Sequence, residues 1–241
     1  VLGDVFQPSS SGGLFFLSIY LFLKGKPYWA TAISALAAVI HPTYLLSAAV
    51  LTIVYGVLHL NETKKIKELI LIGLLAFAIV SGITIYTAMG FLGVDPEIAA
   101  QANQITIHYR QPHHMIISNW FDLRIGGKAV ILAAALYLLA KQRLFWIMLV
   151  PTISVVGLTL LQAITRNPTL AMLFPWRFSV ILVPLSTMIL VGKLLDWFLI
   201  RFPEPHISKK ILYPILATIL LACAATGAIK FTTSLRQQRH D

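Results

Sequence analysis

The feature that most constrains this chain is a series of long apolar blocks separated by short polar loops. A helix needs about 20 residues to cross the roughly 30 Å hydrocarbon core of a bilayer. Five blocks meet that length, whereas the first, second and fifth are shorter, which leaves open whether they cross fully. The pattern predicts an all-α fold, a polytopic transmembrane helical bundle of about eight membrane helices. The eight blocks lie at residues 13–23, 28–40, 43–60, 67–89, 128–140, 144–164, 174–200 and 210–230.

Composition supports the same class of protein. The chain is 58% hydrophobic and only 12% charged, whereas an average soluble domain is about 25% charged. A formal charge of +10 would favour nucleic-acid binding in a soluble protein. Here the basic residues concentrate in short loops between apolar blocks, where membrane topology explains them. We therefore expect the lipid bilayer as a partner and no nucleic acid.

The distribution of Lys and Arg predicts the topology. With the N-terminus outside and alternating crossings, the inner side is richer in basic residues per residue of loop, as the positive-inside rule requires. The basic residues of the tail beyond residue 230 fall outside and count against this arrangement. It places the loops at 61–66 and 201–209 inside and the interval 90–127 outside. Ten of the 19 Lys and Arg lie in the four inner loops: Lys24, Lys26, Lys64, Lys65, Lys67, Lys141, Arg143, Arg201, Lys209 and Lys210.

We expect a single transmembrane helical domain over 1–241. Its longest stretch without an apolar block is the interval 90–127. Loops longer than about 12–15 residues are usually functional or disordered. This one is rich in Ile, Tyr, Trp and Phe, which favours an ordered outer loop. Asp95 followed by Pro96 is typical of a helix start, with Asp95 as the N-cap and Pro96 at the first helical position. We expect a short helix, then the "RQPHH" turn, then an interfacial stretch.

Two groups of cations are candidates for binding an anion. Arg110, His113 and His114 lie in the outer loop, and Pro112 biases the backbone before it away from helix, so that the side chains could converge on a phosphate or a metal. Arg177 lies in "FPWRFS", which opens the seventh block. For the outer-loop group, the structural alternative is that the histidines cap helix ends or meet lipid headgroups. For Arg177, it is that the side chain snorkels to the interface.

Two further patterns favour structural roles. "IHPTY" at 40–44 reads as a tight helix hairpin with a satisfied histidine, in which Thr43 caps the next helix. Lys193 and Asp196 are three residues apart on one helix face and are expected to form an ion pair.

Several motifs do not occur in the sequence. It contains no P-loop, no GxGxxG, no CxxC and no HExxH. The first six blocks carry no charged residue at their centres, which argues against an ion pump or a cation-coupled transporter.

Four stretches together resemble bacterial GT-C-type glycosyltransferases: "VFQPSSSGG", "HPTY", "RQPHH" and "PWRFS". The resemblance implies an integral multi-pass protein of the bacterial inner membrane that uses a polyprenyl-phosphate-linked sugar in cell-envelope glycan synthesis. It implies that Arg110, His113, His114 and Arg177 bind the donor phosphate. The acidic catalytic residue of such enzymes lies in the first outer loop, which here would precede Val1 or be reduced to the stub bearing Asp4. We therefore expect the chain to be a piece of a longer protein.

With that loop missing, Asp95 and Glu97 would be the substitute catalytic acids. The resemblance fixes no cofactor and leaves a divalent metal open. Two other functions also stay open. One is a non-enzymatic subunit or assembly partner that docks other membrane subunits through the outer loop. The other is a transporter of lipid-linked glycans with Arg177 facing a cavity.

Overall fold

The computed structural model describes residues 8–90, 92–110, 116, 123–165, 170, 172–201 and the isolated positions 214, 217, 218, 221 and 225. Contacts divide the chain into two compact units, Val1–Val191 and Gly192–Asp241. The expectation of a single domain over 1–241 stays a prediction.

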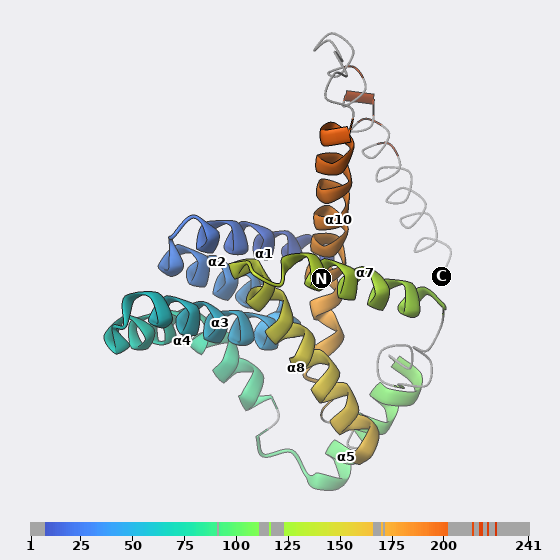
Figure 1. Cartoon of the computed structure of the whole chain (residues 1–241). Coiled ribbons are helices and arrows are strands. Elements are labelled where there is room, and N and C mark those ends of the chain that lie inside the picture. Colours follow the sequence, from blue (N-terminus) through green and yellow to red (C-terminus); the bar gives the residue numbers. More distant parts are fainter. Residues whose placement is uncertain are drawn as a thin grey trace. The chain divides into compact units, whose positions relative to one another are not determined.

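The described residues form helices and no strands (Figure 1). The described residues include eight α-helices, with 3₁₀ turns before α3 and α10 and a π turn after α5. The α-helices are α1 (Pro8–Leu23), α2 (Pro27–Ile40), α3 (Leu45–Thr63), α4 (Ile66–Met89), α5 (Pro96–Ile105), α7 (Leu123–Leu139), α8 (Arg143–Thr165) and α10 (Ser179–Arg201). The short elements are η2 (Pro42–Tyr44), η3 (Thr106–Arg110) and η5 (Pro175–Phe178).

Four helical segments are long and apolar enough to cross a membrane: Pro42–Thr63, Ile66–Met89, Arg143–Thr165 and Pro175–Arg201. They correspond to the third, fourth, sixth and seventh predicted blocks. The three blocks expected to be short are shorter apolar helices in the structure. Most of the eighth block, 210–230, lies outside the described residues. The structure thus agrees with a helical protein that has several candidate membrane-spanning segments, and the number of crossings stays a prediction.

The surface of α4 shows why an apolar environment is needed. Ile72 is the buried residue of this helix, while large side chains such as Phe77, Ile85 and Tyr86 are exposed. Soluble monomers rarely expose a continuous apolar face of this kind. A lipid environment or a partner chain would cover it.

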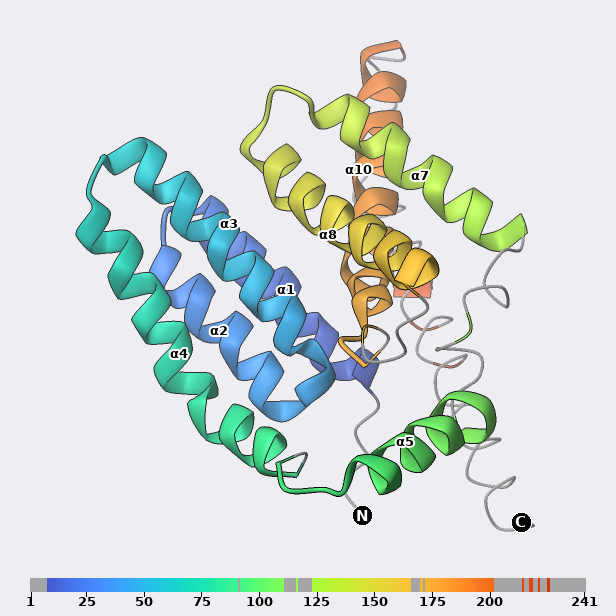
Figure 2. The same ribbon diagram turned by 90° about the horizontal axis from the view of Figure 1, so that it is seen from below.

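In the first unit, α2 is the central helix. It packs against α1, α3 and α4, and α3 also packs against α8; Figure 2 shows α1 to α4 lying side by side. Small residues on α2 permit this, because they let neighbouring backbones approach closely. Gly56 on α3 serves the same end, since a Cβ there would come within 2.4 Å of the Leu69 side chain on α4. The buried small residues of α2 are Ala30, Thr31, Ser34, Ala35, Ala37 and Ala38.

The turns of this unit gather at two ends of the bundle. At one end, the guanidinium of Arg143 pairs with Glu62 at 2.5 Å and lies 5.3 Å from the ring centre of Phe22. The predicted inner loops around residues 24–26, 64–67 and 141–143 therefore share one end, as the predicted alternation requires. Which side of a membrane that end faces stays a prediction.

The start of the outer loop follows its sequence closely. Asp95 is the N-cap of α5, its carboxylate accepts a hydrogen bond from the Glu97 amide at 2.8 Å, and Pro96 occupies the first turn. After Ile105 the chain continues into the π turn η3. Most of 111–122, which includes the expected "RQPHH" turn, lies outside the described residues.

Candidate functional site

Arg177 is positioned by the turn η5 at the start of α10. Phe174, the N-cap of this turn, adopts a left-handed conformation with φ 50°, which costs on the order of 1–3 kcal/mol in a non-glycine residue. The amide of Arg177 donates to the Phe174 carbonyl at 3.0 Å. Pro175 and Phe178 on either side are buried. Burial of these neighbours holds the turn, and with it the guanidinium, at the end of the bundle.

The turn between α2 and α3 provides the second part of the site. His41 ends α2 in an extended conformation, and its Nδ1 is 2.8 Å from Oγ1 of Thr43. The structure therefore confirms a hydrogen-bonded histidine in a tight hairpin. It corrects the expected role of Thr43: the N-cap of α3 is Tyr44, with no side-chain cap, because η2 intervenes and turns the Thr43 hydroxyl back to the imidazole.

Tyr44 links this turn to the core. Its side chain is fully buried, its ring is edge-on to Phe15 at 5.2 Å, and it is also edge-on to His41 at 6.1 Å. Gly12 on α1 makes room for it, because a Cβ at that position would lie 3.1 Å from the Tyr44 hydroxyl oxygen. The phenol thus lies where η2 packs against α1.

Arg177 acts electrostatically on this turn. Burial lowers the pKa of His41 below its usual 6.5, and the positive charge of Arg177 lowers it further. His41 is therefore neutral at neutral pH. The Nε of Arg177 is itself buried and has no hydrogen-bond partner among the described residues. A buried charged donor without an acceptor is costly, so this position favours a ligand that supplies an acceptor.

The outer loop meets the same region through Ile107 in η3. Its side chain is 9% exposed and packs against Ile116, Met172, Phe174 and Trp176. The structure thus brings the backbone segment that carries Arg110 against the segment that carries Arg177. The sequence grouped these two segments only because each carries a cation that could bind a phosphate.

The other predicted site residues have different positions. The side chain of Arg110 and the whole of His113 and His114 lie outside the described residues. Asp95 and Glu97 are exposed at the start of α5, and neither carboxylate has an ion-pair partner in the part of the chain that the structure describes. Their catalytic role stays a prediction, and the geometry gives Asp95 a capping role. No group of three metal-ligating side chains occurs among the described residues.

Sequence reasoning missed two features of the two ends. It treated "HPTY" apart from Arg177, although both break apolar blocks at the predicted outer side. It also missed the pair formed by His59 Nε2 and Glu68 Oε2, 2.5 Å apart at the other end. The only available signal was their position on either side of a short turn.

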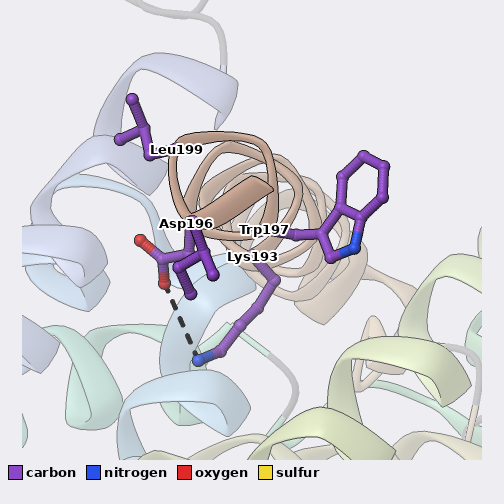
Figure 3. Close-up of a pocket in the computed structure, with 5 residues that line it drawn as sticks. Lys193, Asp196, Trp197 and Leu199 are labelled. Atoms are coloured by element: carbon purple, nitrogen blue, oxygen red, sulfur yellow. Dashed lines mark ion pairs between the residues drawn. The ribbon is translucent and has the colours of Figure 1, made fainter. Parts of the chain in front are cut away.

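The predicted ion pair on α10 is present in the second unit. Nζ of Lys193 lies 3.8 Å from Oδ2 of Asp196, with both side chains exposed (Figure 3). They border a surface pocket of about 530 Å³ with Trp197, Leu199 and Ile200. All five residues come from one helix, and exposed pairs of this kind contribute little to stability. This pocket therefore adds nothing to the site around Arg177.

Comparisons with family models, with curated proteins and with solved structures gave no match for this chain. The function must therefore be argued from the residues and their geometry.

Proposed function

We propose that this chain is a multi-pass membrane protein of the bacterial inner membrane that binds the phosphate of a polyprenyl-linked sugar beside Arg177. We further propose that it acts as a GT-C-like glycosyltransferase in cell-envelope glycan synthesis. The observation that carries the proposal is the buried Nε of Arg177, which has no acceptor among the described residues. A guanidinium forms bidentate hydrogen bonds with two oxygens of a phosphate, and the planar arrangement of its N–H groups matches this ligand well.

The surroundings of Arg177 fit a lipid phosphate. The site lies where the helical segments Pro42–Thr63 and Pro175–Arg201 begin, and both segments are long enough to cross a bilayer. A phosphate there would meet the cation near low-dielectric lipid, where charge-assisted contacts strengthen. The exposed apolar helix surfaces offer a path for the prenyl chain. Packing of Ile107 against Phe174 and Trp176 supports Arg110 as a second ligand from the outer loop.

His41 would assist as a neutral donor. Thr43 holds Nδ1 of the imidazole, which fixes the ring and leaves Nε2 as the nitrogen that could meet a ligand. Because the pKa of His41 is lowered, the ring adds no positive charge to Arg177 at neutral pH. It would then orient the phosphate rather than neutralise it.

Binding of a polyprenyl-phosphate analogue to the purified chain tests the proposal. Arg177→Gln should weaken binding roughly tenfold to a hundredfold, because one charge-assisted contact contributes about 1.5–3 kcal/mol. Lys128→Gln is the matched control, since Lys128 is an exposed cation on α7, and it should change the affinity less than about twofold. Arg110→Gln and His113→Gln test the predicted ligands outside the described residues. Equal affinity of Arg177→Gln and the wild type would contradict the proposal.

The two predicted acids require a test that separates chemistry from folding. Asn caps a helix about as well as Asp, so Asp95→Asn should preserve α5 while removing the carboxylate. Asp95→Ala removes both. A catalytic Asp95 predicts that sugar transfer falls by about a hundredfold or more in both variants, while only Asp95→Ala loses stability. Transfer that persists in Asp95→Asn and in Glu97→Gln would exclude both acids.

A non-catalytic subunit of a larger membrane complex is the second candidate. The use of the Asp95 carboxylate as a helix cap favours it, because a capping oxygen is less available for proton transfer. This candidate expects analogue binding at Arg177 without transfer, together with co-purification of other membrane subunits. A transporter of lipid-linked glycans would instead move the intact lipid across vesicles that contain the purified chain.

A further inference from the structure

The end of the bundle opposite to Arg177 contains a second cavity. It has a volume of about 400 Å³ and is lined chiefly by Lys26, Pro27, Tyr28, Trp29, His59 and Glu68. These residues come from the α1–α2 turn, the end of α3 and the start of α4. The 14 residues of α2 separate this cavity from His41 by about 21 Å, so it is independent of the site proposed above.

The walls of the cavity are built by hydrogen bonds and ion pairs. Amides of the turn donate to carbonyls of α1: Lys24 to Tyr20 at 3.0 Å and Lys26 to Leu21 at 2.9 Å. Glu68 accepts from His59, and its other oxygen is 3.3 Å from Nζ of Lys65. The one carboxylate in the wall is therefore already compensated, and it does not repel an anion as a free carboxylate would.

The charge around the cavity is strongly positive. The other acid at this end, Glu62, is paired with Arg143. Among the described residues, no carboxylate pairs with four lysines of this end: Lys24, Lys26, Lys64 and Lys67. Of these four, Lys26 lines the cavity. The cavity therefore offers a cation to a ligand that brings its own negative charge.

Aromatic and apolar surfaces border the cavity. Trp29 is 66% exposed and Tyr28 is 37% exposed, and both residues line the cavity. Leu71 is exposed on α4, three residues after the cavity-lining Glu68 and therefore on the same side of the helix. Trp and Tyr are the residues that lie at the headgroup level of a bilayer. A ligand with a phosphate at one end and hydrocarbon at the other would match both parts of this surface.

We propose that this cavity is a binding site for an anionic phospholipid, with its headgroup phosphate at Lys26, its glycerol region between Tyr28 and Trp29, and an acyl chain along α4. Lys26 supplies the charge-assisted contact. The aromatic rings fix the depth of the headgroup. His59 is not needed as a ligand, because its Nε2 is hydrogen-bonded to Glu68.

The test is the binding of phosphatidylglycerol to the purified full chain in micelles of a neutral detergent, measured by native mass spectrometry. Lys26→Gln should weaken binding about tenfold, and Lys26→Arg should retain most of it. Lys67→Gln is the matched control, because Lys67 is an exposed cation of the same end that does not line the cavity, and it should change binding less than about twofold. Trp29→Leu should weaken binding without a change of charge. Thermal unfolding of each variant shows whether it is folded.

Several outcomes would overturn the proposal. Equal losses in Lys26→Gln and Lys67→Gln would mean that a diffuse positive surface attracts the lipid. Equal binding of phosphatidylcholine would mean that the headgroup charge is not recognised. Binding of glycerol phosphate as tight as that of the lipid would mean that the cavity takes a free phosphate and no acyl chain.

Discussion

Three helices of the first unit are tied together by one chain of hydrogen bonds, which allows a quantitative prediction. The Ser18 hydroxyl on α1 donates to the Ala30 carbonyl on α2 at 2.7 Å and lies 2.9 Å from the Tyr55 hydroxyl on α3. A serine has a single hydroxyl hydrogen, so Tyr55 must donate to Ser18. The direction of the chain therefore runs from α3 to α1 to α2.

That direction makes the two ends of the Ser18–Tyr55 bond unequal. Tyr55→Phe keeps the ring, which stacks on Phe22 at 4.4 Å, and leaves Ser18 still bonded to Ala30. It should cost about 0.5–1.5 kcal/mol of the unfolding free energy. Ser18→Ala leaves the buried Tyr55 hydroxyl without its acceptor and should cost about 1–3 kcal/mol. The double variant should be no less stable than Ser18→Ala, because no orphaned hydroxyl remains.

Unfolding in detergent micelles, followed by helicity during titration with a denaturing detergent, measures these free energies. Ser154→Ala is the matched control, since that hydroxyl donates to the Val150 carbonyl of its own helix and its removal should be nearly neutral. A larger cost for Tyr55→Phe than for Ser18→Ala would refute the assigned direction. Additive costs in the double variant would refute the coupling between the two hydroxyls.

Two further predictions concern pH and charge. Burial and the charge of Arg177 lower the pKa of His41 in the folded protein, so the unfolded chain binds the proton more tightly. The contribution of neutral His41 to the free energy of unfolding is therefore complete above pH 6.5 and is lost as the pH falls through the lowered pKa. Melting temperatures of the wild type should therefore fall on acidification below pH 6.5 by more than those of His41→Gln. Arg177→Gln should reduce this fall. Parallel curves of melting temperature against pH for the wild type and both variants would contradict the reasoning. Glu62→Gln should cost less than about 1 kcal/mol, because both side chains of the Glu62–Arg143 pair are partly exposed to solvent. High salt should remove the difference from the wild type, and a loss that salt does not change would contradict this.

The helices were predictable because their signals are local. The apolar blocks at 67–89 and 144–164 correspond to α4 and α8, since a continuous apolar run between charged loops has few alternatives to a long helix. The cap at Asp95 was predictable for the same reason, because its partner amide is two residues away. The local signal failed at Thr43, where two neighbouring partners compete for one hydroxyl and the imidazole of His41 is the one bonded.

The contacts between distant segments were not predictable. No periodicity relates Glu62 to Arg143, which is 81 residues away. The approach of Arg177 to His41 likewise depends on how α10 begins beside the α2–α3 turn. Charge and exposure can mark each residue as a candidate, but only packing decides which candidates share a site. The predicted set of Arg110, His113, His114 and Arg177 was chosen by charge, so it could not include the uncharged partners at the α2–α3 turn.

The use of the acidic residues strengthens the argument for an anion at Arg177. Four of the five acids with described side chains have an identified structural role: Glu62 pairs with Arg143, Glu68 with His59 and Lys65, Asp196 with Lys193, and Asp95 caps α5. Glu97 is exposed at the start of α5. None of these carboxylates pairs with Arg177, although its Nε is buried. A half-buried cation whose buried Nε has no acceptor is costly unless a ligand supplies one, and a phosphate at the membrane boundary would supply both the charge and the acceptor.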